Sequence, residues 1–111
     1  MSTKPPKLLE KEIEKKVCDY AKKKGFYVRK FTSPCARAVP DRLFITPMGK
    51  VFFIEFKRTG EKPTLHQLRE HRMLKEVNAL VVVVDNIPRG LEVIDAADRG
   101  YITQEEIEKY L

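Results

Sequence analysis

"VPDRLFITPMGKVFFIEFKR", residues 39–58, decides the fold because it places charged side chains inside a β-hairpin pattern. Two short apolar runs, RLFIT (42–46) and KVFFIEFK (50–57), are joined by a segment containing Pro and Gly, which predicts a hairpin. Glu55 and Lys57 lie in the second run, among phenylalanines. An unpaired charge among apolar groups is costly, so a buried charge is usually paired or bound to a metal. The pattern therefore indicates that these two charges have partners.

The faces of this hairpin predict which side chains meet. Side chains alternate along a strand, so Glu55 and Lys57 share one face near its C-terminal end. Asp41 precedes the first strand, and in a hairpin the start of one strand lies opposite the end of the next. We therefore expect Asp41 to lie close to both. One face carries Val51, Phe53, Glu55 and Lys57, and the other carries Phe52, Ile54 and Phe56.

Two carboxylates and a lysine are the components of a hard-cation site. Mg²⁺ prefers carboxylate oxygens, a backbone carbonyl and water. A nearby lysine can orient or deprotonate a water, or stabilise charge on a phosphoryl group. The set predicts phosphodiester hydrolysis. The alternative is an edge strand on which Glu55 and Lys57 pair with each other in solvent, and the apolar residues on both faces argue against it.

The remaining chain predicts an α/β fold with the order α-β-β-β-α-β-α, a mixed central sheet flanked by helices. Four consecutive valines favour a central strand covered on both faces. Thr103 and Glu106 have the spacing of a capping box before the last helix. The expected elements are helices over 8–24, 64–77, 88–98 and 104–111 and strands over 26–31, 42–46, 50–57 and 80–85.

The length of 111 residues predicts a single domain, 1–111, in which residues 1–7 form a flexible lead-in. No apolar run approaches the roughly 20 residues of a membrane span, and the N-terminus lacks the apolar stretch of a secretory signal. Cys18 and Cys35 show no metal-site spacing. We therefore expect reduced thiols in a cytoplasmic protein, in the host cell if a phage encodes it, with no membrane partner.

The charge is unevenly distributed along the chain. The net charge is +6, but residues 1–75 hold 19 Lys and Arg against 8 Asp and Glu, whereas residues 76–111 hold 3 against 8. A basic region of this kind favours binding of a polyanion such as nucleic acid. The alternative is that the Lys-rich helices are simply well solvated.

At Pro40-Asp41 and Glu55-Phe56-Lys57 the chain resembles the PD-(D/E)XK nuclease superfamily. It resembles the VRR-NUC (virus-type replication-repair nuclease) family more narrowly, in SPCARAVPDRLFI (33–45), VFFIEFKR (51–58) and TLHQLREHRML (64–74). The resemblance implies a restriction-endonuclease-like core and Mg²⁺-dependent activity, with Mn²⁺ as a substitute. It also implies short, often phage-encoded members, several of which act as homodimers on branched DNA such as Holliday junctions. No small-molecule cofactor is expected.

The resemblance also implies a site beyond Asp41, Glu55 and Lys57. It implies an acidic residue on the first helix, for which Glu14 fits best and Glu10, one turn earlier, is the alternative. Gln67 matches a glutamine that follows the Glu-x-Lys strand in the family, although Thr64 and Gln67 also have capping-box spacing. The expected metal ligands are Glu14, Asp41, Glu55 and the Phe56 carbonyl, and the expected DNA contacts are Lys30, Ser33, Arg37, Arg42, Arg58 and Arg72.

The remaining candidate side chains allow other interpretations as well. Ser33 can equally cap its own loop. His66 and His71 are five residues apart and so do not form a metal pair on one helix face. We expect His71 and Arg72 to face solvent or phosphate.

These observations predict a Mg²⁺-dependent, structure-selective endodeoxyribonuclease. Three alternatives remain at this point: a non-catalytic DNA-binding module on a nuclease fold, a structural or inhibitory protein that binds through its acidic end, and a restriction or nicking endonuclease.

Overall fold

The computed structural model describes residues 8–36, 38–100 and 103–105. Within these residues the chain follows the predicted order, and every boundary falls within two residues of the expected one. The elements are α1 (Glu10–Lys23), β1 (Tyr27–Lys30), β2 (Arg42–Ile45), β3 (Val51–Phe56), α2 (Leu65–Glu76), β4 (Leu80–Val84) and α3 (Ile87–Asp98).

The four strands of the described residues form one mixed sheet in the order β1-β2-β3-β4. The first three strands are antiparallel neighbours, and β3 pairs with β4 in parallel, which confirms the predicted mixed sheet. The expectation of a central position for β4 was wrong, since β4 lies at the edge. Its free side is covered at Val81, whose N–H donates to Gln104 Oε1 and whose carbonyl accepts from Gln104 Nε2, both at 3.0 Å. The apolar side chains of β4 are covered by α2 on one face of the sheet and α3 on the other, so the predicted burial on both faces is confirmed.

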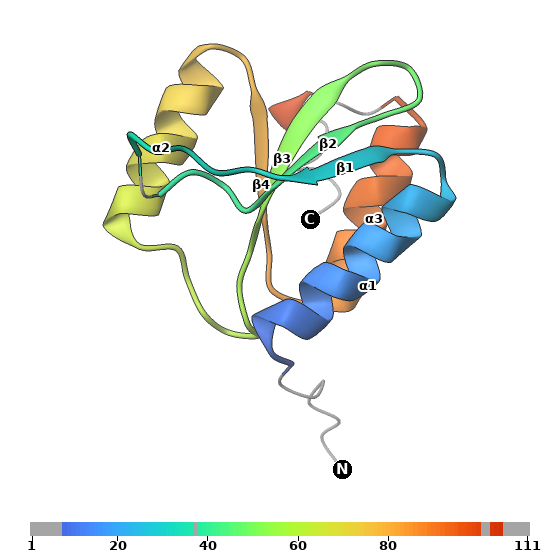
Figure 1. The fold of residues 1–111 in the computed structure, drawn as a ribbon, viewed down its shortest axis with the longest axis horizontal. Helices are drawn as coiled ribbons and strands as arrows, with labels where there is room; N and C mark the ends of the chain where they lie inside the picture. The colour runs from blue at the N-terminus through green and yellow to red at the C-terminus, as the bar shows by residue number, and fades with distance from the viewer. Residues whose placement is uncertain (1–7, 37, 101–102, 106–111) are drawn as a thin grey trace.

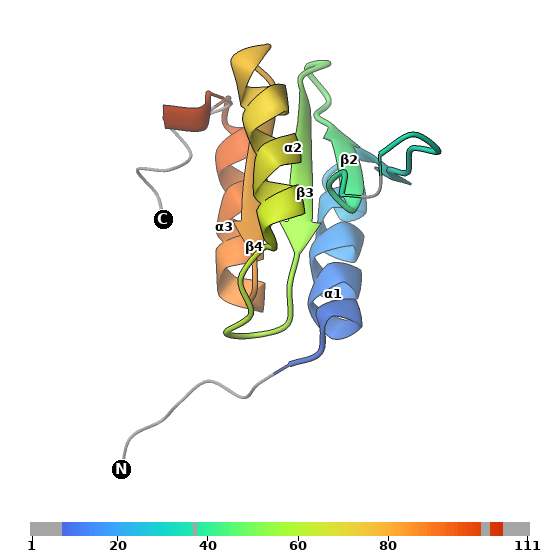
Figure 2. The same cartoon turned by 90° about the vertical axis from the view of Figure 1, so that its left-hand side faces the viewer.

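The sheet lies between two layers of helices. Figure 1 shows α1 and α3 on one side of the strands and α2 on the other, and Figure 2 shows α2 in front of the sheet. The main core lies on the side of α1 and α3, where β3 contributes Phe52, Ile54 and Phe56, the face predicted from alternation. The other face of β3 carries Phe53, which packs on Phe31, and Glu55. One face of β3 therefore packs into the main core, and the opposite face carries the charged side chain of Glu55.

The packing of α1 on α3 follows from small and apolar residues at helical spacing. Ile13, Val17 and Ala21 are four residues apart on α1 and fully buried. Gly90 of α3 lies against Val17 so closely that a Cβ at this position would overlap the valine side chain. Gly25 ends α1 with φ +86, a conformation that glycine adopts without strain. These contacts hold α1 firmly, with its first residue at the end of the sheet where β3 finishes.

Some predictions fall wholly or partly outside the described residues. The lead-in 1–7 and Arg37 lie outside them, as does most of the predicted final helix over 104–111, including Glu106 of its capping box. Among the described helices, none is long and apolar enough to cross a membrane. Cys18 is buried, Cys35 is exposed, and both are free thiols.

Candidate active site

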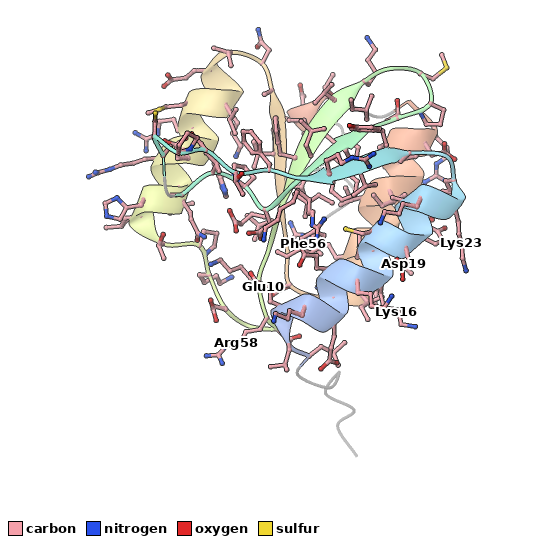
Figure 3. The ribbon with its side chains drawn as sticks, in the orientation of Figure 1. Glu10, Lys16, Asp19, Lys23, Phe56 and Arg58 are labelled. Carbon is pink, nitrogen blue, oxygen red and sulfur yellow. The ribbon has the colours of Figure 1, made fainter. Side chains whose placement is uncertain are left out.

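Three carboxylates from separate parts of the chain meet at one end of the sheet. Glu10, Asp41 and Glu55 each offer an oxygen atom, and these atoms all lie within 4.8 Å of one another. Glu10 is the first residue of α1, Asp41 precedes β2, and Glu55 is the fifth residue of β3. Figure 3 shows Glu10 at the start of α1, below the end of β3 where Phe56 lies. Lys16, Asp19 and Lys23 lie farther along the helix in the same view. We call Glu10, Asp41 and Glu55 the carboxylate cluster.

The hairpin register brings Asp41 to Glu55. Arg42 of β2 pairs with Ile54 of β3, so Asp41 lies beside the residues that follow Ile54. The Phe56 N–H donates to Asp41 Oδ2 at 2.7 Å, which fixes the carboxylate against the strand. The structure thus places Asp41 as the alternation and hairpin geometry predict.

Glu55 is almost completely buried and is held by α2. Its side chain is 1% exposed. Gln67 Nε2 donates to Glu55 Oε2 at 3.3 Å, and His71 Nε2 lies 3.3 Å from Glu55 Oε1. Each oxygen of a buried carboxylate therefore has a partner on the helix that covers this face of the sheet. The side chains of Gln67 and His71 set the orientation of Glu55.

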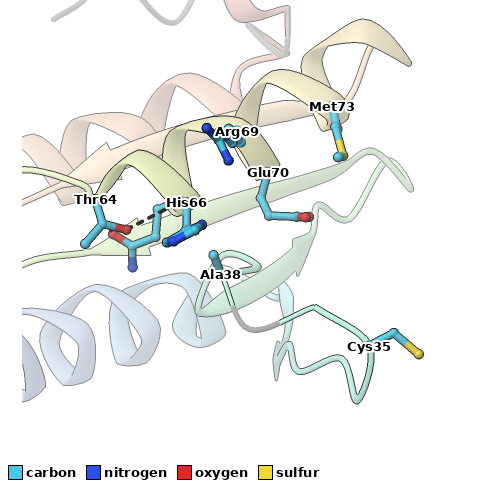
Figure 4. A pocket seen from close by; sticks show the side chains of 8 residues that line it. Cys35, Ala38, Thr64, His66, Arg69, Glu70 and Met73 are labelled. Carbon is cyan, nitrogen blue, oxygen red and sulfur yellow. Dashed lines mark hydrogen bonds between the residues drawn. The ribbon is translucent and has the colours of Figure 1, made fainter.

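Gln67 fulfils both roles that the sequence left open. Its side-chain oxygen accepts from the Thr64 N–H at 2.9 Å and its backbone N–H donates to Thr64 Oγ1 at 3.2 Å, which completes a capping box. Its amide nitrogen is then directed to Glu55. Gln67 and Thr64 also line a groove of about 690 Å³ between α2 and the loop that carries Cys35 and Ala38 (Figure 4). Gln67 therefore connects this groove to Glu55 of the carboxylate cluster.

The expectation that His71 faces solvent or phosphate was wrong. Its ring is buried, with 5% of the side chain exposed, and it contacts Glu55. Burial lowers the pKa of His71, so the neutral ring is favoured, and as the tautomer with a proton on Nε2 it donates to the carboxylate. The signal was present in the sequence: residues four apart share a helix face, so if Gln67 faces the site, His71 does too.

Lys57 lies immediately after β3 and is buried, with 7% of the residue exposed. Its Nζ lies 3.7 Å from Glu61 Oε1, in the turn that follows the strand. The alternative of an exposed edge strand is wrong, since β3 lies between β2 and β4 and both Glu55 and Lys57 are buried. Glu61 was missed by sequence reasoning, because Glu four residues after Lys reads as an ordinary surface pair.

The pKa values of all three carboxylates in the cluster are raised. Burial, a hydrogen bond shared with Glu55 and the charge of Glu55 raise the pKa of Asp41 from 3.8 to about 7. Burial likewise raises the pKa of Glu55, although the hydrogen bond with Asp41 and the charge of Lys57 oppose this. Loss of solvation, followed by the charge of Asp41, raises the pKa of Glu10. All three shifts have the sign expected when carboxylates crowd together in a partly buried site.

The structure reverses the expected order of the two helix carboxylates. Glu10 joins the cluster, whereas Glu14 Oε2 accepts from Arg42 Nε at 2.6 Å, an ion pair with both side chains partly buried. Both glutamates lie on one face of α1, one turn apart. An oxygen of Glu10 in the first turn lies within 4.8 Å of oxygens of Asp41 and Glu55, whereas the carboxylate of Glu14, one turn farther along, is paired with Arg42.

The expected DNA contacts are differently placed. Arg42 is paired with Glu14, and Arg58 Nε pairs with Glu61 Oε2 at 2.8 Å. Ser33 Oγ accepts from the Cys35 N–H at 3.3 Å, which is the local loop cap that the sequence also allowed. Lys30 ends β1 and Arg72 lies on α2, and both are exposed. Contact with DNA stays a prediction for all of them.

Comparison with known proteins gives a consistent result. No family model matches the chain. The chain is 47% identical over 77 residues to "Putative nuclease p44" of Acyrthosiphon pisum secondary endosymbiont phage 1, a match that covers 69% of this chain and 83% of that protein. A solved VRR-NUC domain is 32% identical, with a TM-score of 0.74, covering 78% of this chain and 94% of the other. A second VRR-NUC domain protein is 20% identical, with a TM-score of 0.69, covering 81% and 88%, and shows the likeness of fold alone.

The fold and these relatives define the class of the protein: it is a nuclease, a hydrolase that acts on phosphodiester bonds. This result argues against the alternatives of a non-catalytic DNA-binding module and of a structural or inhibitory protein. Within that class the chain belongs to the VRR-NUC family. The expected restriction-endonuclease-like architecture is confirmed by this likeness.

Proposed function

We propose that this nuclease is a divalent-cation-dependent endonuclease that cuts branched DNA. The observation that carries the proposal is the carboxylate cluster, three carboxylate oxygens within 4.8 Å of one another beside the buried Lys57. Oxygen donors alone, at this separation, suit Mg²⁺, with Mn²⁺ as a substitute.

The arrangement of these three carboxylates suits a bound cation, independently of the family resemblance. Burial, and to a lesser extent the charge of a neighbouring carboxylate, raises the pKa of each of the three groups, and a dication at their centre would offset both effects. Glu10, Asp41 and Glu55 would hold it, and the Phe56 carbonyl stays the predicted further ligand. When bound, such a cation activates water and stabilises negative charge on the phosphoryl group.

The protein's own side chains would then orient the reaction. Lys57 Nζ donates a hydrogen bond that positions the attacking water, whose oxygen forms a bond to phosphorus. The water gives up a proton to solvent, the bond from phosphorus to the 3′ oxygen breaks, and that oxygen takes up a proton from solvent, so the products are a 3′ hydroxyl and a 5′ phosphate. Gln67 and His71 keep Glu55 in one orientation throughout, because each holds one of its oxygens.

The family resemblance supports the finer parts of the proposal. We infer selectivity for branched DNA such as Holliday junctions, and action as a homodimer, since two cuts in a junction need two sites. The outer side of α2 offers apolar surface for such an interface, with Leu65, Leu68, Met73 and Val77 exposed. We also infer that residues 1–111 work as one domain, in the cytoplasm of the host cell if a phage encodes the chain.

Cleavage of linear, flapped and four-way DNA tests the proposal. Each substrate is incubated with Mg²⁺, with Mn²⁺ and with EDTA, using the wild type, Lys57→Ala and Lys50→Ala. Lys50 is the matched control because it lies exposed at the opposite end of the same hairpin. We expect cleavage only with the cation, and a loss of about 10²–10⁴-fold in Lys57→Ala but not in Lys50→Ala.

Three results would contradict the proposal, wholly or in part. Cutting in EDTA, or full activity in Lys57→Ala, would exclude the mechanism. Equal rates on linear and four-way DNA would exclude the selectivity alone and leave a restriction-type or nicking activity. Sedimentation of the protein with and without DNA tests the homodimer.

A further inference from the structure

We propose that Thr59 is a positioning residue that sets Glu10 in the carboxylate cluster. Thr59 and Leu8 are clasped by two hydrogen bonds across 51 residues of sequence. The Leu8 N–H donates to Thr59 Oγ1 at 3.2 Å, and the Thr59 N–H donates to the Leu8 carbonyl at 3.2 Å. Glu10 follows Leu8 by two residues, and Thr59 follows Lys57 by two. The clasp therefore joins the two chain segments that enter and leave the site.

The start of α1 needs such a clasp because it has no cap of its own. Leu9 occupies the N-cap position and provides no side-chain hydrogen bond, unlike Thr64 of α2 and Asn86 of α3. First turns of helices fray when their N–H groups lack partners. Glu10 lies in this first turn, so its position depends on whatever fixes the residues before it.

Thr59 is well placed to do so because its own turn is anchored. The Lys57 N–H donates to the Val84 carbonyl at 2.9 Å, and the Gly60 N–H donates to Asp85 Oδ2 at 3.1 Å. Both acceptors belong to β4 or the residue directly after it. The turn is thus tied to the sheet on either side of Thr59, and the clasp transmits that fixed position to α1.

This inference rests on the proposed cation site, and its consequence is a change in cation affinity. Thr59→Val removes the hydroxyl acceptor and keeps the branched shape. We expect Mn²⁺ binding, measured by titration calorimetry without DNA, to weaken about tenfold, as when other supports of metal ligands are lost. Thr59→Ser keeps the hydroxyl and should bind Mn²⁺ as the wild type does. Thr59→Ala removes the same group with less bulk and should match Thr59→Val.

Thr46→Val is the matched control. Thr46 Oγ1 accepts from the Met48 and Lys50 N–H groups, both at 3.2 Å, in the turn at the far end of the β2–β3 hairpin. The same substitution there removes the same chemical group, so it should lower the melting temperature and leave Mn²⁺ affinity unchanged. A general loss of stability would affect both variants alike.

Glu10→Gln separates failure of this inference from failure of the proposed site. If Glu10→Gln binds Mn²⁺ as the wild type does, Glu10 is no ligand and the proposed site is wrong. If Glu10→Gln weakens binding but Thr59→Val does not, only the role of Thr59 is overturned. We expect Thr59→Val to have no further effect in the Glu10→Gln background, because its influence passes through Glu10. An additive effect would overturn the inference.

Discussion

Asp41→Asn should stabilise the cation-free protein while abolishing its activity. Burial, followed by the hydrogen bond with Glu55 and the charge of Glu55, raises the pKa of Asp41 from 3.8 to about 7. A carboxyl group with a raised folded-state pKa contributes stability that is fully present below its unfolded pKa and is lost as the pH rises through the folded value. For Asp41 this loss falls between about pH 4 and pH 7. At pH 8 the folded protein carries the full cost of an ionised Asp41.

The size of the effect follows from the shift in pKa. The rise in the pKa of Asp41 from 3.8 to about 7 corresponds to a free energy of about 4 kcal/mol, since a tenfold change in an acid dissociation constant corresponds to roughly 1.4 kcal/mol. Because the side chain is only partly buried, we expect a gain of about 2–4 kcal/mol in the free energy of unfolding at pH 8. Asparagine does not ionise, and its carbonyl oxygen can still accept from the Phe56 N–H. Near pH 4 the two proteins should be about equally stable.

Urea unfolding in EDTA at pH 4.5 and pH 8 measures this difference. Asp19→Asn is the control, since Asp19 is an exposed carboxylate whose hydrogen bond with Lys15 lowers its pKa, so its removal should bring no gain at pH 8. A variant Asp41→Asn that is no more stable than the wild type at pH 8 would refute the reasoning. With saturating Mn²⁺ the order should invert, because binding stabilises only a protein that retains its ligands.

Two further predictions concern packing and thiol chemistry. Gly90→Ala should lower the free energy of unfolding by about 1–3 kcal/mol, because the new Cβ overlaps the side chain of Val17. In the double variant with Val17→Ala this overlap is relieved, so chemical denaturation should show a smaller loss than the sum of the two single losses. In a thiol titration of the native protein, Cys35 should react at once. Cys18 should react only on unfolding, since burial raises its pKa to about 11, and immediate reaction of both thiols would contradict its burial.

The fold could be predicted from the sequence because its signals are local. Apolar spacing, the Thr64–Gln67 capping box, the Gly25 stop and the hairpin turn each act within a few residues, and the seven elements from α1 to α3 formed where they were expected. The position of β4 could not be predicted in this way. A run of valines indicates burial on both faces, but not that a distant glutamine side chain would cover the open edge.

The site residues differ in the same way: some could be placed from local sequence signals and others depend on tertiary packing. Asp41 and Glu55 belong to one hairpin, so alternation and register placed them together. Glu10 was only the second choice because helix periodicity shows which residues share a face, not which turn reaches the sheet. His71 depends on how α2 docks over Glu55, and this docking is a property of the tertiary structure.

The charges around the site indicate why a cation would control substrate binding as well as chemistry. A phosphodiester is an anion, and a cluster of three carboxylates repels it. The basic first part of the chain does not simply offset this, since Arg42 and Arg58 are each paired with a glutamate. Lys57, the nearest buried ammonium, lies beside Glu61. Without a cation, the protein is therefore electrostatically unfavourable to its own substrate at the point of cleavage and basic elsewhere. It should then hold DNA at its surface and admit a phosphate to the cluster only once a dication has neutralised most of the local negative charge.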